Sequence, residues 1–136
     1  MSLIQDIIEA YLDNHYDHSY YFDTHEKSIY MEMDEALTGE SGIDWDDEAN
    51  ERRYLPIPKV LSNEVYGWML EFEMQQTHSK LLRALNSRKP FREFKETAEQ
   101  LGLLEKWYEY ENERALKRIR RWADEMNILE ELEKAA

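Results

Sequence analysis

Residues 81–126 read LLRALNSRKPFREFKETAEQLGLLEKWYEYENERALKRIRRWADEM, and this stretch decides the fold. Two helical patterns follow one another in it. Large aromatic side chains recur on their apolar sides: Phe91, Phe94, Trp107, Tyr108 and Trp122. Aromatic side chains bury the largest area per residue that a short chain can offer. We therefore expect the core to form around the helices near 91–101 and 103–126.

Proline and glycine mark the ends of these helices. Pro90 stands where a first helical residue belongs, and Gly102 ends the helix that it opens. Apolar spacing predicts the inward residues of the two helices as Phe94, Ala98 and Leu101, then Tyr108, Ala115, Ile119, Trp122 and Met126. Upstream, the same spacing predicts a helix over 63–77 with Phe72 inward, capped by Ser62, and a short helix over 79–87.

The N-terminal half combines one helix with strands. Ser2 and Gln5 form a capping-box pattern before a helix over 3–13. Residues 18–33 read as a β-hairpin with a polar turn across 23–27, because Ile29, Met31 and Met33 alternate with polar or aromatic residues. Residues 53–58 contain two prolines, which predicts an edge strand. The fold class that we expect is α+β: a small antiparallel sheet of two to three strands packed against four to five helices, with a helical C-terminal half.

The 136 residues suffice for one core, so we expect a single domain over 1–136. Residues 38–51 hold seven acidic residues and two glycines, which predicts a mobile loop, and the tail over 127–136 either continues the last helix or frays. Asp44, Asp46 and Glu48 alternate as in a calcium loop, but the sixth and twelfth positions are Ala49 and Leu55. A calcium loop needs Gly and Glu there, so a solvated acidic loop is favoured.

The net charge of −13 is concentrated in one half of the chain. Residues 1–64 contain 16 acidic and 4 basic residues, whereas residues 65–136 contain 14 and 13. A negative field repels the phosphate backbone, which disfavours general DNA binding. The charge difference between the halves allows a homodimer that pairs head to tail, and it equally allows pairing within one chain.

The sequence indicates a soluble cytoplasmic protein. It contains no Cys, which excludes disulfides and thiolate sites. Asp6 and Glu9 interrupt what a signal peptide would need as a basic and then apolar start. No run approaches 18 apolar residues, so we expect no membrane contact.

His15, His18 and His25 lie among Asp13, Asp17 and Asp23. Imidazole and carboxylate together can bind zinc or iron, but no metal motif spacing is present. We therefore expect no metal and no other cofactor. Catalytic signatures such as a Gly-rich phosphate loop or a nucleophile elbow are also missing, which favours a non-enzymatic role without excluding an enzyme.

The basic residues of the last helix are the candidate binding site: Arg114, Lys117, Arg118 and Arg121. Adjacent guanidinium groups can hold phosphate, so RNA or phosphate binding is one hypothesis. The same helix carries its acidic residues first and its basic residues later, which complements the helix dipole, and Glu113 precedes Lys117 by four residues. Structural or intramolecular pairing is therefore the favoured interpretation of these bases.

Several segments together resemble a known family. LLRALNSRKPFREF and EKWYEYENERALKRIRRWADEMNI resemble the Phe-Arg-x-Phe segment, Trp-bearing helix and final basic-then-aromatic stretch of the bacterial uncharacterised protein family 0158. YYFDTHEKSIYMEM is similar to its Tyr-rich strand pair, although Glu26 and Lys27 stand where Gly is more usual. RYLPIPKVLSNEVYGWMLEF is similar to its proline-containing strand and following helix. The resemblance covers about residues 16–126 and implies a bacterial, soluble, single-domain protein with no established activity.

Two functions follow as hypotheses. The first is a non-enzymatic module that binds a protein partner, because charge separation favours complementary docking. The alternative is an RNA or phosphate-ligand binder that uses the basic residues from Arg114 to Arg121. Steep salt dependence would distinguish the second.

Overall fold

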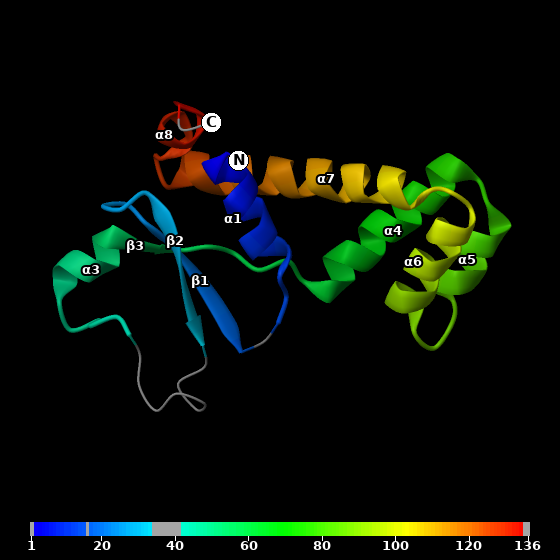
Figure 1. The fold of residues 1–136 in the computed structure, drawn as a ribbon, viewed down its shortest axis with the longest axis horizontal. Coiled ribbons are helices and arrows are strands. Elements are labelled where there is room, and N and C mark those ends of the chain that lie inside the picture. Colours follow the sequence, from blue (N-terminus) through cyan, green and yellow to red (C-terminus); the bar gives the residue numbers. More distant parts are fainter. Residues whose placement is uncertain (1, 16, 34–41, 135–136) are drawn as a thin grey trace. The chain divides into compact units, whose positions relative to one another are not determined.

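The computed structural model describes residues 2–15, 17–33 and 42–134 (Figure 1). By the contacts between its residues, the chain divides into two compact units. The first unit comprises Met1–Val60 and Leu116–Ala136, and the second comprises Leu61–Ala115. Each unit has its own set of buried residues, as described below. A single domain over 1–136 stays a prediction.

The first unit contains a three-stranded antiparallel sheet with strand order β2-β1-β3 (Figure 1). Its strands are β1 (His18–Asp23), β2 (Ser28–Met33) and β3 (Tyr54–Pro56). The predicted hairpin and the predicted edge strand are therefore confirmed. Pro56 is tolerated because β3 is at the edge of the sheet and a proline there removes no interior ladder bond.

Helix α1 (Leu3–Leu12) begins as predicted at Ser2, whose hydroxyl oxygen accepts a hydrogen bond from the Gln5 backbone N–H at 3.2 Å. It contacts β1 and β2. Its buried residues include Ile7, Ile8 and Tyr11, and the sheet adds Phe22. The remaining core of this unit comes from the loops and from the later helices: Ile43, Ile57, Val60, Ile119, Trp122, Ala123, Ile128 and Leu132.

Two short helices stand where the sequence predicted a loop and a tail. Helix α3 (Glu48–Arg53) falls in the predicted acidic loop and begins at Asp47, whose carboxylate accepts from the Ala49 N–H at 3.0 Å. The loop prediction is wrong there, and its residues 38–41 lie outside the described residues. Helix α8 (Leu129–Lys134) is separated from the preceding helix by Asn127, whose φ is 61°. This turn stops the long helix and lets Ile128 and Leu132 be buried.

The second unit is helical. It contains α4 (Ser62–Gln76), α5 (Ser79–Leu85), α6 (Pro90–Gln100) and the first part of α7 (Leu104–Glu125). Pro90 opens α6 as predicted. Ser62 is the first residue of α4 rather than its cap, because the Glu64 carboxylate instead accepts the Leu61 N–H at 3.3 Å.

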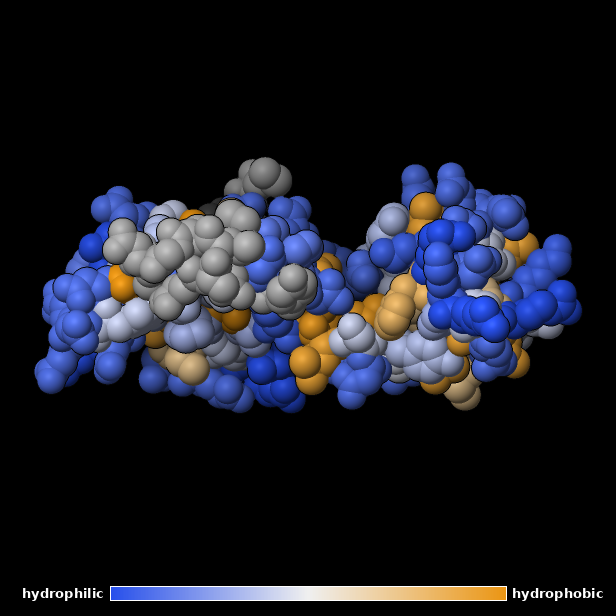
Figure 2. Space-filling view, turned by 90° about the horizontal axis from the view of Figure 1, so that it is seen from below, coloured by the Kyte–Doolittle hydropathy of each residue, from blue (hydrophilic) through white to orange (hydrophobic). Residues whose placement is uncertain are grey.

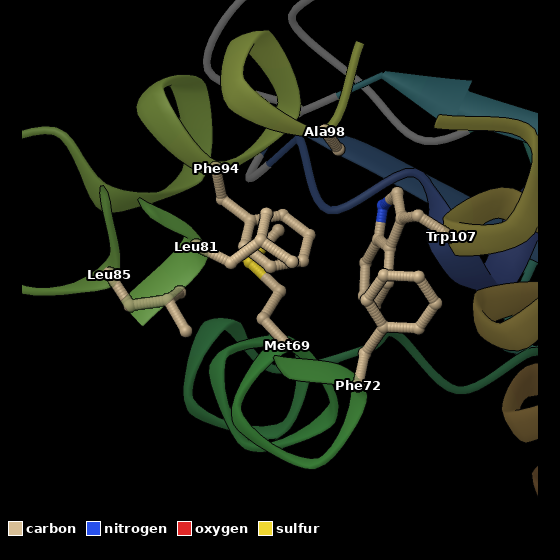
Figure 3. Close-up of a cluster of buried hydrophobic side chains, with 7 residues drawn as sticks. All are labelled: Met69, Phe72, Leu81, Leu85, Phe94, Ala98 and Trp107. Atoms are coloured by element: carbon tan, nitrogen blue, oxygen red, sulfur yellow. The ribbon is translucent and has the colours of Figure 1, made fainter. Parts of the chain in front are cut away.

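Aromatic rings form the centre of the second unit (Figure 3). Phe72, Phe94 and Trp107 are buried, and their ring centroids lie 5.1 to 6.1 Å apart in edge-on pairs. Such pairs add about 0.5–1.5 kcal/mol beyond the area that they bury. Met69, Leu81, Leu85 and Ala98 complete the cluster. The predicted burial of Phe72, Phe94, Ala98, Trp107 and Trp122 is therefore confirmed.

Three predicted core residues are exposed instead: Phe91, Tyr108 and Met126. Tyr108 follows the buried Trp107, and one residue on a helix is a turn of about 100°, so both cannot point into the same core. Met126 lies just beyond the last residue of α7. Phe91 lies in the first turn of α6, where one side of its ring meets Tyr66 and 37% of the side chain stays exposed.

The described residues confirm an α+β fold with a helical C-terminal half. They form seven helices, because α3 and α8 add to the expected set. Hydrophilic residues cover most of the described surface in Figure 2, in keeping with a charged fraction of 35%. Among the described helices, none has the length and apolar content that crossing a membrane requires.

Candidate functional site

Arg114, the first of the predicted binding residues, is held by side chains of the second unit. Its Nη2 donates to Glu71 Oε2 at 2.5 Å and to the Tyr110 hydroxyl oxygen at 2.9 Å. The Tyr110 hydroxyl in turn donates to Glu71 at 2.6 Å, and the Arg114 guanidinium lies 5.2 Å from the centroid of the Tyr110 ring. These contacts occupy Arg114 within the fold, in the way that the intramolecular interpretation predicts for that residue.

The other three predicted residues lie in the part of α7 that belongs to the first unit. Lys117 and Arg121 are exposed, and neither forms an ion pair within the described ranges. Arg118 is part-buried, and its Nη1 has no hydrogen-bond partner among the described residues. Of the four cations, only Lys117 and Arg121 are thus openly exposed.

A group of aromatic side chains, which sequence reasoning did not single out, gathers on one face of the sheet. We call Tyr21, Tyr30, Trp45 and Tyr54 the aromatic face. The strand register pairs Tyr21 with Tyr30 and Asp23 with Tyr54, and alternate residues of a strand share a face. Trp45, from the loop before α3, lies 5.4 Å from Tyr21 and 6.4 Å from Tyr54, and Tyr30 lies 5.8 Å from Tyr54, between ring centroids.

The aromatic face is accessible at Trp45. This side chain is 37% exposed, whereas the three tyrosines are part-buried. Gly42 approaches Tyr30 so closely that a Cβ at position 42 would lie 2.0 Å from the tyrosine oxygen. Only glycine fits there unless the ring moves. The alternation of Tyr21 and Tyr30 on a predicted hairpin could have indicated this face, but Trp45 stood in a stretch interpreted only as an acidic loop.

Charged residues surround the aromatic face. The Arg53 guanidinium lies 4.9 Å from the centroid of Tyr54 and makes two hydrogen bonds of 2.9 Å to the Asp23 carboxylate. Glu32 Oε2 is buried and has no hydrogen-bond partner among the described residues. The stretch from Trp45 through α3 adds exposed carboxylates, namely Asp44, Asp46, Asp47, Glu48 and Glu51. The aromatic face is therefore bordered by negative charge.

A second group lies between α1 and β1, where the sequence placed its His and Asp residues. His15, Asp17 and His18 each offer a ligand atom, and these atoms lie within 4.8 Å of one another. Asp13 Oδ2 accepts hydrogen bonds from His18 Nδ1 at 3.0 Å and from the Tyr20 hydroxyl at 2.5 Å. The Tyr20 bond and then the His18 bond lower the pKa of Asp13 to about 2, and the same contact with Asp13 raises the pKa of Tyr20 to about 12.

The two other members of that sequence cluster do not join it. His25 is exposed in the hairpin turn, where its backbone N–H donates to Asp23 at 2.9 Å. Asp23 itself is engaged by Arg53. The structure therefore separates the six residues into a group of Asp13, His15, Asp17 and His18 and a hairpin-turn pair.

An open cavity of about 340 Å³ lies in the second unit along α5 and α6. Lys80, Arg83, Ser87 and Thr97 line it together with Glu93. Lys80 and Arg83 form no ion pair among the described residues. Residues 74–92 contain five Lys and Arg and no acidic residue, a pattern that could have indicated this local positive charge in an acidic chain.

Comparison with known proteins decides the family. The model of the group described as uncharacterised protein family UPF0158 matches residues 2–134. The chain belongs to this family. The resemblance seen in the sequence is thereby confirmed, and the UPF0158 match extends beyond it at both ends.

A curated member of the UPF0158 family, UPF0158 protein PA5073 of Pseudomonas aeruginosa, is 38% identical to the chain over 81 residues. The matched segment covers 56% of this chain and 50% of that relative, so it spans about half of the relative's length. No solved structure matches the chain. The family description states no activity, so function is argued from the residues themselves.

Proposed function

We propose that this UPF0158 protein is a non-enzymatic interaction module of the bacterial cytoplasm that binds a basic segment of a partner protein on its aromatic face. The observation that carries the proposal is Trp45, a large aromatic side chain that is 37% exposed beside three part-buried tyrosines. Tyr, Trp and Arg dominate the binding energy of protein interfaces, and here they occur together.

The charge around the aromatic face supports a basic partner. The first unit holds twenty acidic and nine basic residues, so its field attracts Lys and Arg side chains. Aromatic rings also bind such cations directly, with an attraction of about 0.5–2 kcal/mol per contact. Arg53 over Tyr54 is an example within the chain. A Lys- or Arg-rich segment would therefore find both rings and carboxylates on one surface.

The proposal is tested with a fluorescent Lys/Arg-rich peptide, and binding is followed by anisotropy. We expect the wild-type protein to bind it, and Trp45→Ala to weaken binding about tenfold or more, as for a central interface aromatic. Phe91→Ala is the matched control, because Phe91 has the same exposed fraction but lies in the second unit. It should leave the affinity unchanged.

Two further probes decide against other readings. An acidic peptide should not bind, and affinity for the basic peptide should fall as salt rises, because screening weakens the attraction. Equal loss in Trp45→Ala and Phe91→Ala, or no binding of the basic peptide, would contradict the proposal. Tight binding of a single-stranded RNA that is lost in Lys117→Glu/Arg121→Glu would instead support the alternative function.

A further inference from the structure

His15, Asp17 and His18 lie at the turn that joins α1 to β1, and their ligand atoms converge. His15 Nδ1 is bonded to Asp17 Oδ1, and His18 Nε2 lies 3.9 Å from the same oxygen. The two imidazole rings stack with centroids 4.6 Å apart. Neutral imidazole nitrogen and carboxylate oxygen are ligands that Zn²⁺ and related divalent cations prefer. We propose that these three side chains bind a divalent transition-metal cation of the zinc class.

Asp13 supplies the support that a histidine ligand needs. His18 Nδ1 donates to Asp13 Oδ2 at 3.0 Å, which leaves the lone pair of the neutral ring on Nε2, the nitrogen that faces Asp17. A carboxylate behind a metal-bound histidine is a recurrent arrangement, because it sets the ring orientation and raises the basicity of the ligand. The Tyr20 hydroxyl holds the same Asp13 oxygen at 2.5 Å.

The backbone of the turn is also held in place. The His15 N–H donates to Asp13 Oδ1 at 3.1 Å, and the His15 carbonyl accepts from the His18 N–H at 3.1 Å. Lys59 Nζ donates to the same carbonyl at 2.5 Å. These bonds fix the spacing of the two histidines, so a cation would meet a site that is largely formed before it binds.

The distances require little adjustment. Ligand atoms about 2.0–2.2 Å from a tetrahedral zinc ion lie about 3.3 Å apart, so a shift of roughly half an ångström in His18 would complete the set. The side chains of His15, His18 and Asp17 are 56%, 25% and 13% exposed, so a cation can enter from solvent. Three protein ligands leave one tetrahedral position for water or an external ligand.

Hydrogen-bonded His–Asp pairs alone could also account for the contacts, and metal titration distinguishes the two explanations. Untagged full-length protein is treated with chelator, dialysed and titrated with ZnCl₂ by calorimetry, and CoCl₂ is followed by its visible absorption. We expect one ion per chain and a cobalt spectrum with nitrogen and oxygen ligands. His15→Ala/His18→Ala should lose the binding, and Asp13→Asn should weaken it about 10–100-fold.

His25→Ala is the matched control, because it removes an exposed histidine of the same unit that lies outside the cluster. It should bind zinc like the wild type. If far-UV circular dichroism shows that the double variant is unfolded, His18→Gln alone carries the same expectation. The proposal is wrong if the wild type binds no stoichiometric zinc, or if a folded His15 or His18 variant binds it as tightly as His25→Ala does.

Discussion

At the scale of single residues, Asp23 is the charged side chain that the described fold buries, at 5% exposure. Arg53 makes two hydrogen bonds of 2.9 Å to its carboxylate, and the backbone N–H groups of His25 and Glu26 donate to it at 2.9 and 3.2 Å. The Arg53 bonds, with help from these backbone N–H groups, lower the pKa of Asp23 to about 2. One carboxylate thus joins the hairpin turn to the end of α3.

The depressed pKa predicts a loss of stability in acid. The ordinary pKa of an unfolded Asp is about 3.9, so the stabilisation by ionised Asp23 is present above that pH and is lost as pH falls towards 2. We expect a contribution of about 1–2 kcal/mol, below the full value of the shift because water screens part-exposed Arg53. Urea unfolding of wild type and Asp23→Asn from pH 6 to pH 2 measures it.

The difference between the two proteins isolates Asp23 from Asp13, whose pKa is also low. Their free energies of unfolding should differ most at pH 6 and converge at pH 2, because the protonated carboxyl resembles the amide. A difference that stays constant over this range would show that the ion pair contributes nothing to folding.

Residue-scale predictions from the sequence succeeded where burial depends on size and failed where it depends on angle. Phe94, Trp107 and Trp122 are large side chains in the middle of apolar stripes, and all three are buried. Tyr108 and Phe91 belong to the same stretch, but the 3.6-residue period gives a broad stripe and does not say which edge residue the neighbouring helix covers. That information resides in tertiary packing.

At the scale of elements, two helix ends show what local sequence can specify. At the end of α6, the Leu103 N–H donates to the Ala98 carbonyl at 2.7 Å and the Gly102 N–H to Glu99 at 3.1 Å. At the end of α7, Ile128 and Asn127 make the equivalent bonds to Ala123 and Asp124 at 2.9 and 3.1 Å. Both are Schellman motifs. Gly102 was predicted as a helix end, whereas Asn127 was not, because Asn takes this role less often.

A pair of glycine substitutions tests this reading of the helix ends. Gly102 has φ of 72°, and a Cβ there would meet no atom within 4 Å, so Gly102→Ala should cost only backbone strain, about 1–2 kcal/mol. Gly67 lies inside α4 and also has open space around its Cβ. Gly67→Ala should therefore stabilise the protein by about 0.5–1 kcal/mol.

Urea unfolding followed by far-UV circular dichroism measures both variants, and the opposite signs are the test. If both substitutions changed stability in the same direction, backbone conformation would not be the cause. The contrast also explains why glycine alone is an ambiguous signal in a sequence. Only the apolar residues on either side of Gly102 marked it as a boundary between two helical patterns.

The candidate sites were harder to predict than the elements. The basic residues of the last helix form an obvious run in the sequence, yet Arg114 is engaged by Glu71 and Tyr110. The aromatic face draws Trp45 and Tyr54 to two strands of a hairpin more than ten residues away. The His–Asp group was visible as a composition, but its convergence depends on the backbone of one turn. Sites of this kind arise from pairing across the fold, which residue spacing does not contain.

At the scale of the whole molecule, acidity belongs mainly to one unit. The first unit has twenty acidic and nine basic residues, and the second has ten and eight. Printed ion pairs of the first unit involve three of its basic residues, in Arg53–Asp23, Arg120–Glu133 and Lys27–Glu131. Exposed pairs stabilise a fold by only about 0–1 kcal/mol each. Repulsion among the remaining carboxylates should therefore outweigh them.

This balance predicts that salt stabilises the protein. Raising NaCl screens the repulsion and should raise Tm by several degrees, the shift that about 1 kcal/mol produces in a chain of this size. Two exposed positions provide a matched comparison at low salt. Asp46→Lys relieves the acidic unit and should raise Tm, whereas Glu109→Lys lies in the balanced unit and should change it less.

The gap between these two variants should close at high salt, because screening removes the long-range term that separates them. Thermal unfolding by circular dichroism at low and high NaCl measures all four combinations. A Tm that falls with salt would mean that the ion pairs outweigh the repulsion. The acidic surface would then be costless to the fold, and its proposed role of attracting a basic partner would no longer be set against a penalty in stability.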